Sequence, residues 1–206
     1  MNCIDLIKDI AGNLNSIIQQ HPDVVDIPTP DYGWINHRYC SPSFRLAHIE
    51  IFDQNRFGVV HCCVFPHATD PSPIFGFDVI AGENKITGVF MDLSPTVSPV
   101  LPFLEISVSS NRQRPDWGDI FSDHWLASRP TFEEMQVIGK EAQRLLLSYL
   151  RNTLGKTGNE DAIRLAQNHY CEQQRKNIHT RRALETLLGQ EGAEEFMSTI
   201  LFPACN

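Results

Sequence analysis

Four ionisable side chains interrupt short apolar segments in the first half of the chain: His48, Glu50, His61 and Asp78. Successive side chains of a strand point to opposite faces, so His48 and Glu50 would share one strand face. If the segments that carry these residues are neighbouring strands, all four side chains enter one pocket. Carboxylates and histidines in an apolar pocket have displaced pKa values and suit proton transfer near neutral pH. The pattern therefore indicates a candidate acid–base site.

Each of these residues also has a simpler interpretation. A single His on a strand is more often a satisfied core or edge residue than a catalyst, and a single Asp at a strand end often caps a turn. Four together favour a site, but periodicity alone does not choose between the two interpretations. His48, Glu50 and His61 are also candidate metal ligands, although His-x-Glu with a distant His is a loose spacing. Cys62 and Cys63 beside His61 are interpreted as small buried apolar residues rather than a redox pair.

The segments that would position these residues have the pattern of short strands. Residues 44–52, 57–65, 74–80 and 85–93 are rich in Val, Ile and Phe, and Gly, Pro, Asn and Asp separate them. We expect a further strand over 103–108. Because the connections are too short to hold crossover helices, the sequence predicts a largely antiparallel meander.

Helical spacing of apolar residues frames these strands on both sides. It predicts helices over 2–20, after Thr131 with a Thr131–Glu134 capping box, and over 159–177, 180–188 and 191–201. Residues 22–43 are expected to form a loop. Helix, strands and helices in this order give an α+β chain. Since the strands are apolar on both faces, helices are expected to cover both sides of the sheet.

Composition restricts the function further. The 206 residues are expected to form a single domain over 1–206. The net charge of −8 disfavours bulk nucleic-acid binding. No apolar run is long enough for a membrane span, and no signal peptide is visible, so we expect a cytosolic protein. Six cysteines without C-x-x-C spacing are interpreted as reduced thiols, and no Gly-rich phosphate loop indicates a nucleotide cofactor.

Two segments in the second half have open interpretations. Residues 175–182 form the densest basic cluster, which is either a solvated helix end or an anion site for a ligand carboxylate or an acidic partner. Residues 117–121, preceded by Arg112 and Arg114, combine aromatic and basic side chains as either core or pocket wall.

Taken in order, these motifs resemble the ferredoxin-dependent bilin reductases over about residues 40–203. The matching stretches are 44–50 (FRLAHIE), 60–66 (VHCCVFP), 73–82 (PIFGFDVIAG), 92–95 (DLSP), 117–122 (WGDIFS), 169–177 (HYCEQQRKN) and 180–182 (TRR), followed by a tail from Phe196 to Phe202. A set of motifs in a fixed order is far more specific than any one of them.

The resemblance implies a three-layer α/β/α sandwich around a central antiparallel β-sheet. It implies biliverdin IXα, an open-chain tetrapyrrole with two propionates, as the substrate, lying between the sheet and the C-terminal helices. Electrons would come one at a time from reduced 2Fe-2S ferredoxin through bilin radical states. The protein would hold no flavin or metal of its own and would act as a monomer, with neither nucleic acid nor membrane as a partner.

The resemblance also assigns roles to residues. Asp78 matches the aspartate that contacts the bilin lactam and donates the first proton, and His61 matches its relay partner. Glu50 matches the glutamate near an outer-ring vinyl group, and His48 resembles a supporting histidine. This Glu, His and Asp combination is that of the phycocyanobilin:ferredoxin oxidoreductase branch. The family places propionate-binding groups at Thr87, Arg112 and His179, and other pocket-lining groups at Trp117 and Asn177.

One departure bears on the product. The family usually has Asp after the Asn of its last basic motif, where this chain has Ile178. Compact members of the phycocyanobilin-type lineage are known from marine phage, and some make phycoerythrobilin. The short chain therefore favours phycoerythrobilin, with phycocyanobilin as the alternative, in a cyanobacterial or phage-infected host cytosol. A carrier that binds bilin without turnover is the second hypothesis, and a metal-dependent enzyme is the third.

Overall fold

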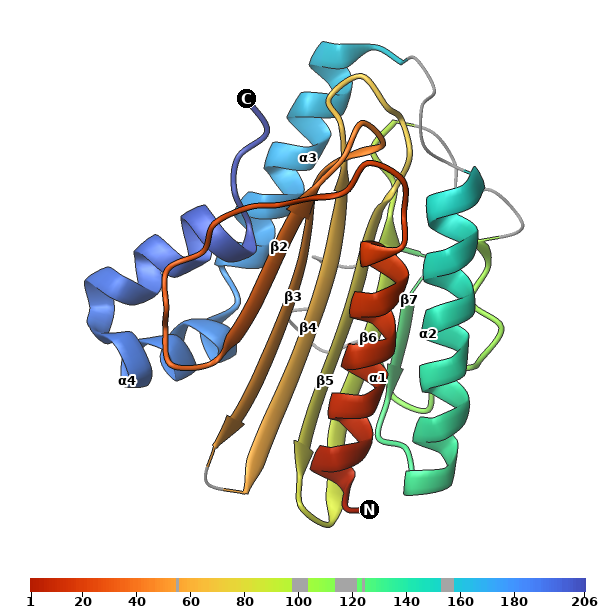
Figure 1. The fold of residues 1–206 in the computed structure, drawn as a ribbon, viewed down its shortest axis with the longest axis vertical. Helices are drawn as coiled ribbons and strands as arrows, with labels where there is room; N and C mark the ends of the chain where they lie inside the picture. The colour runs from red at the N-terminus through yellow and green to blue at the C-terminus, as the bar shows by residue number, and fades with distance from the viewer. Residues whose placement is uncertain (55, 98–103, 114–121, 124, 153–157) are drawn as a thin grey trace.

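One antiparallel sheet forms the middle of the molecule (Figure 1). The computed structural model describes residues 1–54, 56–97, 104–113, 122–123, 125–152 and 158–206. Within these ranges seven strands lie in chain order, each paired antiparallel to the next. They are β1 (Val25–Asp26), β2 (Ile35–Cys40), β3 (Phe44–Gln54), β4 (Phe57–Pro66), β5 (Ile74–Gly82), β6 (Lys85–Ser94) and β7 (Trp125–Ser128). The predicted meander is confirmed.

Helices cover both faces of this sheet. Helices α1 (Cys3–Gln19) and α2 (Phe132–Asn152) pack against one face, and the larger apolar core lies beneath them. Helices α3 (Glu160–Arg175) and α4 (Ile178–Glu195), with the π-helix η3 (Phe196–Leu201), cover the other face over a second, smaller core. Figure 1 shows the two pairs on opposite sides of the strands. The predicted α+β class and α/β/α sandwich are confirmed.

The predicted helices all occur, with one change of shape. The Thr131–Glu134 capping box is present, because each backbone N–H bonds to the other residue's side chain. The segments expected over 180–188 and 191–201 are separated at Gly189, whose φ of 74° interrupts the helical backbone. Glycine adopts this left-handed conformation without a Cβ clash, so the break falls where the sequence allows it.

Two strand predictions were wrong. Residues 22–43 contain β1 and β2, which extend the sheet beyond β3, rather than only a loop. The described part of the expected strand 103–108 is not a strand, and β7 lies beside β6 instead. Leu104 is buried, and Ile106 and Val108 pack against the same core, so the apolar alternation is real. However, backbone groups of this segment bond to side chains of α2 rather than to a neighbouring strand.

No helix in the described ranges is both long and apolar enough to cross a membrane.

Candidate active site

Three of the ionisable residues lie side by side in one row across the sheet. The register places Glu50 of β3 opposite His61 of β4, and His61 opposite Asp78 of β5. Directly opposed residues of antiparallel strands have Cβ atoms ~4.5–5.5 Å apart on the same face. The alternation in the sequence and this register together place the three side chains on the face covered by α3 and α4.

His61 and Asp78 form a hydrogen-bonded pair. The His61 Nδ1 atom lies 2.7 Å from Asp78 Oδ1, and the Asp78 side chain keeps 41% of its surface exposed while that of His61 keeps 9%. Burial lowers the pKa of His61, but the charge and hydrogen bond of Asp78 and the charge of Glu50 outweigh it, so the pKa is raised. The buried His61 Nε2 has no hydrogen-bond partner among the described residues. The His61–Asp78 pair can therefore hold a proton next to Asp78, whose carboxylate is partly exposed.

Glu50 is a buried carboxyl group with an altered acidity. The residue is 8% exposed, and burial raises the pKa of Glu50 to about 7, although His61 and the Trp34 indole lower it in part. A carboxylic acid of this kind exchanges its proton near neutral pH, which is the property of an effective general acid. Glu50 and the His61–Asp78 pair thus provide two proton-handling groups in one row.

His48 lies behind this row rather than in it. It is fully buried, its Nε2 is 3.0 Å from Asn36 Oδ1, and its ring centroid is 5.5 Å from that of His61. Burial, and then the charges of His61 and Arg38, hold the pKa of His48 well below its usual value. His48 is therefore neutral and supports the His61 ring from one side. Phe202 meets the His61 ring edge-on, with 5.8 Å between the ring centroids.

A cavity of about 420 Å³ lies over the row. This volume is within the ~300–1,000 Å³ typical of small-molecule sites. The cavity has a mainly apolar wall, and Glu50, His61 and Asp78 contribute polar groups on the sheet side. The full lining comprises Glu50, Phe52, Phe57, Val59, His61, Asp78, Ile80, Thr87, Gly88, Phe90, Arg112, Gln174, Asn177, His179, Thr180, Ala183, Leu184, Leu187, Leu201 and Phe202.

The cavity brings together most of the remaining predicted site residues. Thr87, Arg112 and the pair Asn177 and His179 all line it, from three separate parts of the sequence. The Arg112 guanidinium lies over the Phe90 ring, 5.7 Å from the centroid. Asn177 caps α4 by accepting hydrogen bonds from the backbone N–H groups of His179 and Thr180. His48 does not line the cavity, and Trp117 lies outside the described residues.

Sequence reasoning missed the apolar wall on the helix side. Ala183, Leu184 and Leu187 of α4, with Leu201 and Phe202, close the cavity opposite the sheet. The tail motif from Phe196 to Phe202 indicated part of this wall. The sequence of α4 has no strong amphipathic pattern, and in the structure only two of its residues are buried. Ile178 is 53% exposed and does not line the cavity.

Metal and thiol alternatives receive no support from the geometry. In the described part of the chain, no group of three His, Cys, Asp or Glu side chains is arranged to hold a metal ion. Cys62 and Cys63 are fully buried, and burial raises the pKa of both thiols, so both are protonated and inert. The interpretation of these two residues as small core side chains is confirmed.

Comparisons with known proteins give a consistent result. Residues 33–203 match the model of a family described as ferredoxin-dependent bilin reductase. The chain is 33% identical over 184 residues to the phycocyanobilin:ferredoxin oxidoreductase of a Synechococcus species, covering 81% of this chain and 74% of that protein. It is 28% identical to the enzyme of the same name from Trichodesmium erythraeum, covering 98% and 94% of the two chains.

Solved structures show the same fold. The structure of PcyX superposes with a TM-score of 0.70 at 27% identity, covering 97% of this chain and 99% of that one. Tomato phytochromobilin synthase, solved in complex with biliverdin, superposes with a TM-score of 0.66 at 13% identity, covering 98% and 83%.

Proposed function

Because the chain belongs to the ferredoxin-dependent bilin reductase family, we propose that it reduces biliverdin IXα to a phycobilin with electrons taken singly from reduced 2Fe-2S ferredoxin. The family match supports the oxidoreductase activity and the electron donor. The tomato protein of the same fold, which was solved with biliverdin, supports the substrate. We place the reaction in the cytosol of a cyanobacterium or of its phage-infected host and expect the enzyme to act as a monomer.

The observation that carries this proposal is the row of Glu50, His61 and Asp78 beneath an apolar cavity. A bilin held there in van der Waals contact gains electrons from outside, and each electron must be matched by a proton. Asp78, which is the most exposed of the three, donates to the nearest bilin atom, and His61 returns a proton to it through their hydrogen bond. Glu50 protonates a second position at the other end of the row.

The cavity rim carries groups suited to the two propionates. Arg112 and His179 line the cavity and carry hydrogen-bond donors, and Thr87, whose hydroxyl donates to the Ile80 carbonyl, lines it as well. Charge-assisted hydrogen bonds to a carboxylate are stronger than neutral ones. The propionates thus fix the bilin's position, and the row of acids and histidine acts on the rings.

Phycoerythrobilin is the product that we assign, with phycocyanobilin as the alternative. The chain is compact, and it superposes on PcyX with a TM-score of 0.70 over 97% of this chain and 99% of that one. Among the described residues that line the cavity, the carboxylates are Glu50 and Asp78, and Ile178, which stands where the family usually has an aspartate, adds none. Proton delivery at the α4 end then depends on His179 or on water.

Anaerobic turnover of biliverdin with reduced ferredoxin, with the product identified by chromatography against bilin standards, tests the proposal. Asp78→Asn should bind biliverdin normally and lose ~10²–10⁴-fold in turnover, as expected for removal of a general acid. Asp53→Asn, which removes an exposed carboxylate of the same sheet paired with Lys8, is the matched control and should turn over normally. Full activity of Asp78→Asn would contradict the assigned acid. Binding by the wild type with no product would instead support the carrier hypothesis.

A further inference from the structure

The segment 104–112 connects the two faces of the sheet. Leu104, Ile106 and Val108 pack on the core beneath α1 and α2, whereas Arg112 lines the cavity on the opposite face. Between these points the segment runs beside β7, the last strand in the sheet order. The position of Arg112 in the cavity therefore depends on how the segment is held on the other side of the sheet.

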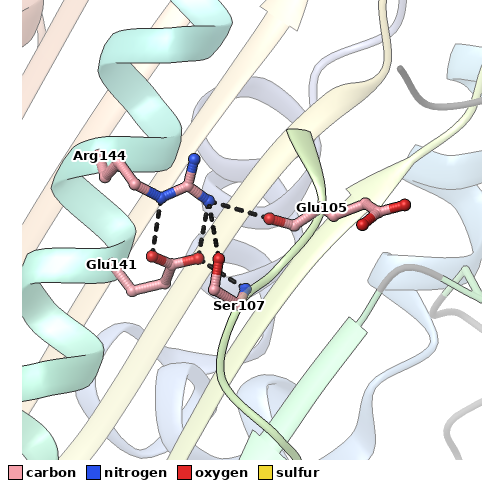
Figure 2. A network of polar contacts seen from close by, with 4 residues as sticks. All are labelled: Glu105, Ser107, Glu141 and Arg144. Carbon is pink, nitrogen blue, oxygen red and sulfur yellow. Dashed lines mark hydrogen bonds and ion pairs between the residues drawn. The ribbon is translucent and has the colours of Figure 1, made fainter. Parts of the chain in front are cut away.

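An ion pair of α2, between the buried Glu141 and the exposed Arg144, holds the first half of the segment (Figure 2). Glu141 accepts two hydrogen bonds from Arg144, from Nε at 2.8 Å and from Nη2 at 2.7 Å. The same carboxylate accepts from the Ser107 backbone N–H at 2.7 Å, and Arg144 Nη2 donates to the Glu105 backbone carbonyl at 2.9 Å. In Figure 2 the Glu105 side chain points away from this cluster, so its backbone carbonyl makes the contact.

The burial of Glu141 shows that the pair is more than a surface contact. Glu141 is 8% exposed and belongs to the buried face of α2. The hydrogen bonds from Arg144 and Ser107 hold the pKa of Glu141 below its usual value although burial opposes this. Removing Arg144 takes the partner from the Glu141 charge and from the Glu105 carbonyl, and removing Glu141 takes it from the Arg144 charge and from the Ser107 N–H. The segment 105–107 thus depends on both side chains.

The edge strand β7 holds the second half. Ala127 N–H donates to Ser110 Oγ at 3.0 Å, Arg129 N–H donates to Asn111 Oδ1 at 2.9 Å, and Arg112 N–H donates to the Ala127 carbonyl at 3.2 Å. These bonds fix the backbone of Arg112 beside the sheet. Its guanidinium then extends over Phe90 into the cavity. Only four residues lie between Ser107 and Arg112, so an altered position at Ser107 is transmitted to Arg112.

We propose that Glu141 and Arg144 are positioning residues for Arg112, acting from the opposite face of the sheet to fix the group that binds a ligand carboxylate. This inference rests on the proposed function for the identity of the ligand, a bilin with propionate groups. Neither Glu141 nor Arg144 lines the cavity, and their effect on binding passes through the backbone of 105–112.

A double-mutant cycle with two ligands tests the proposal. The dissociation constants of biliverdin and of its dimethyl ester are measured for the wild type, Arg144→Ala, Arg112→Gln and the double variant. Arg112→Gln should weaken biliverdin binding about tenfold or more, in line with the loss of a charge-assisted hydrogen bond. Arg144→Ala should weaken it several-fold, leave the ester unaffected, and add nothing in the Arg112→Gln background.

Matched variants separate positioning from folding. Arg164→Ala removes another arginine–glutamate ion pair, within α3, and should leave both dissociation constants unchanged. Arg144→Lys keeps the charge but loses the two-pronged contact, so it should give an intermediate effect even where Arg144→Ala folds poorly. Additive losses, or equal losses for biliverdin and the ester, would overturn the inference.

Hydrogen exchange of the ligand-free protein gives an independent result. In Arg144→Ala the amides of Ser107 and Arg112 should exchange faster than in the wild type, whereas those of β4 should not. Unchanged protection of the Arg112 amide would overturn the positioning role whether or not the protein binds biliverdin. Absence of biliverdin binding by the wild type would overturn the proposed function alone.

Discussion

Replacing Glu50 with glutamine should make the protein more stable at high pH and alter it little at low pH. Burial raises the pKa of Glu50 from 4.5 to about 7. Between pH 4.5 and about pH 7, Glu50 keeps its proton in the native state but loses it in the unfolded chain. The stability of the native state therefore falls as the pH rises through this range. At about 1.4 kcal/mol per pKa unit, the loss amounts to about 3 kcal/mol by pH 8. Glutamine has a similar shape and no charge, and it therefore avoids this loss.

The measurement is the free energy of unfolding in urea at pH 5, 6, 7 and 8 for both proteins. The two should differ little at pH 5, diverge as the pH rises toward about 7, and keep a nearly constant difference above it. The attraction between ionised Glu50 and protonated His61 partly offsets this loss in the wild type, and the pKa of Glu50 already includes it. Taking the difference between the two free energies of unfolding cancels the contributions of groups that titrate alike in both proteins.

Glu141 provides a control of opposite sign. Its pKa is lowered, chiefly by the hydrogen bonds from Arg144, so its ionised form stabilises the protein above the unfolded pKa, and this contribution is lost as the pH falls through the folded pKa. Glu141→Gln should therefore be destabilised at pH 7–8 and approach the wild type at low pH. Parallel pH profiles for the wild type and Glu50→Gln would refute the assignment of a neutral, buried acid at Glu50. A Glu141→Gln profile that diverges in the same direction as Glu50→Gln would refute the electrostatic reasoning.

Three further predictions concern packing and the thiols. Gly139→Ala should lower the melting temperature, because the new Cβ would lie 2.6 Å from Ile10 Cδ1. Gly12→Ala is the control: its new Cβ would have no atom within 4 Å, so the change should be neutral or stabilising by up to ~1 kcal/mol. In the native protein a thiol reagent should react rapidly only with Cys40, since the other five cysteines are buried, and unfolding should expose the rest. Asn168→Ala should make Cys205 a second rapidly reacting thiol, because Asn168 exchanges two hydrogen bonds with the Cys205 backbone; an unchanged count of fast thiols would contradict this.

The acid–base row was accessible to sequence reasoning because a strand has a fixed period. Alternation places His48 and Glu50 on one face of β3, and the short turns of a meander make β3, β4 and β5 neighbours. Alternation does not give the register, however. The structure supplies it by pairing Glu50 with His61 and His61 with Asp78, and the same register moves His48 into the neighbouring row opposite Cys63. The strand register was therefore needed to distinguish Glu50, which lines the cavity, from His48, which supports His61 from behind.

The segment before β7 shows why the remainder was not predictable. The alternation of Leu104, Ile106 and Val108 correctly indicates burial, and burial with a period of two was taken to mean a strand. A strand also needs a partner for its backbone, and here those groups bond to Glu141 and Arg144, more than thirty residues further along the chain. Apolar periodicity contains no information on such side-chain partners. The same limit applies to α4, where Leu184 and Ala193 belong to the smaller core while Ala183 and Leu187 line the cavity.

The choice of product depends on how two separate parts of the structure are aligned. The sheet fixes Glu50, His61 and Asp78 at strand spacing, so the distances between the proton donors are set by β3, β4 and β5. In the proposed function the ligand's position along this row is set elsewhere, by Arg112 on the segment beside β7 and by His179 at the start of α4, which both line the cavity. A shift of the anchors by a fraction of the strand spacing would bring a different bilin carbon opposite the same donor. Substitutions that change the product without abolishing turnover should therefore occur among the anchors and the residues that hold them, such as Arg144, whereas substitutions in the row should change the rate. Under the proposed function the row therefore carries the proton chemistry, and we expect the anchors to determine where on the bilin it occurs.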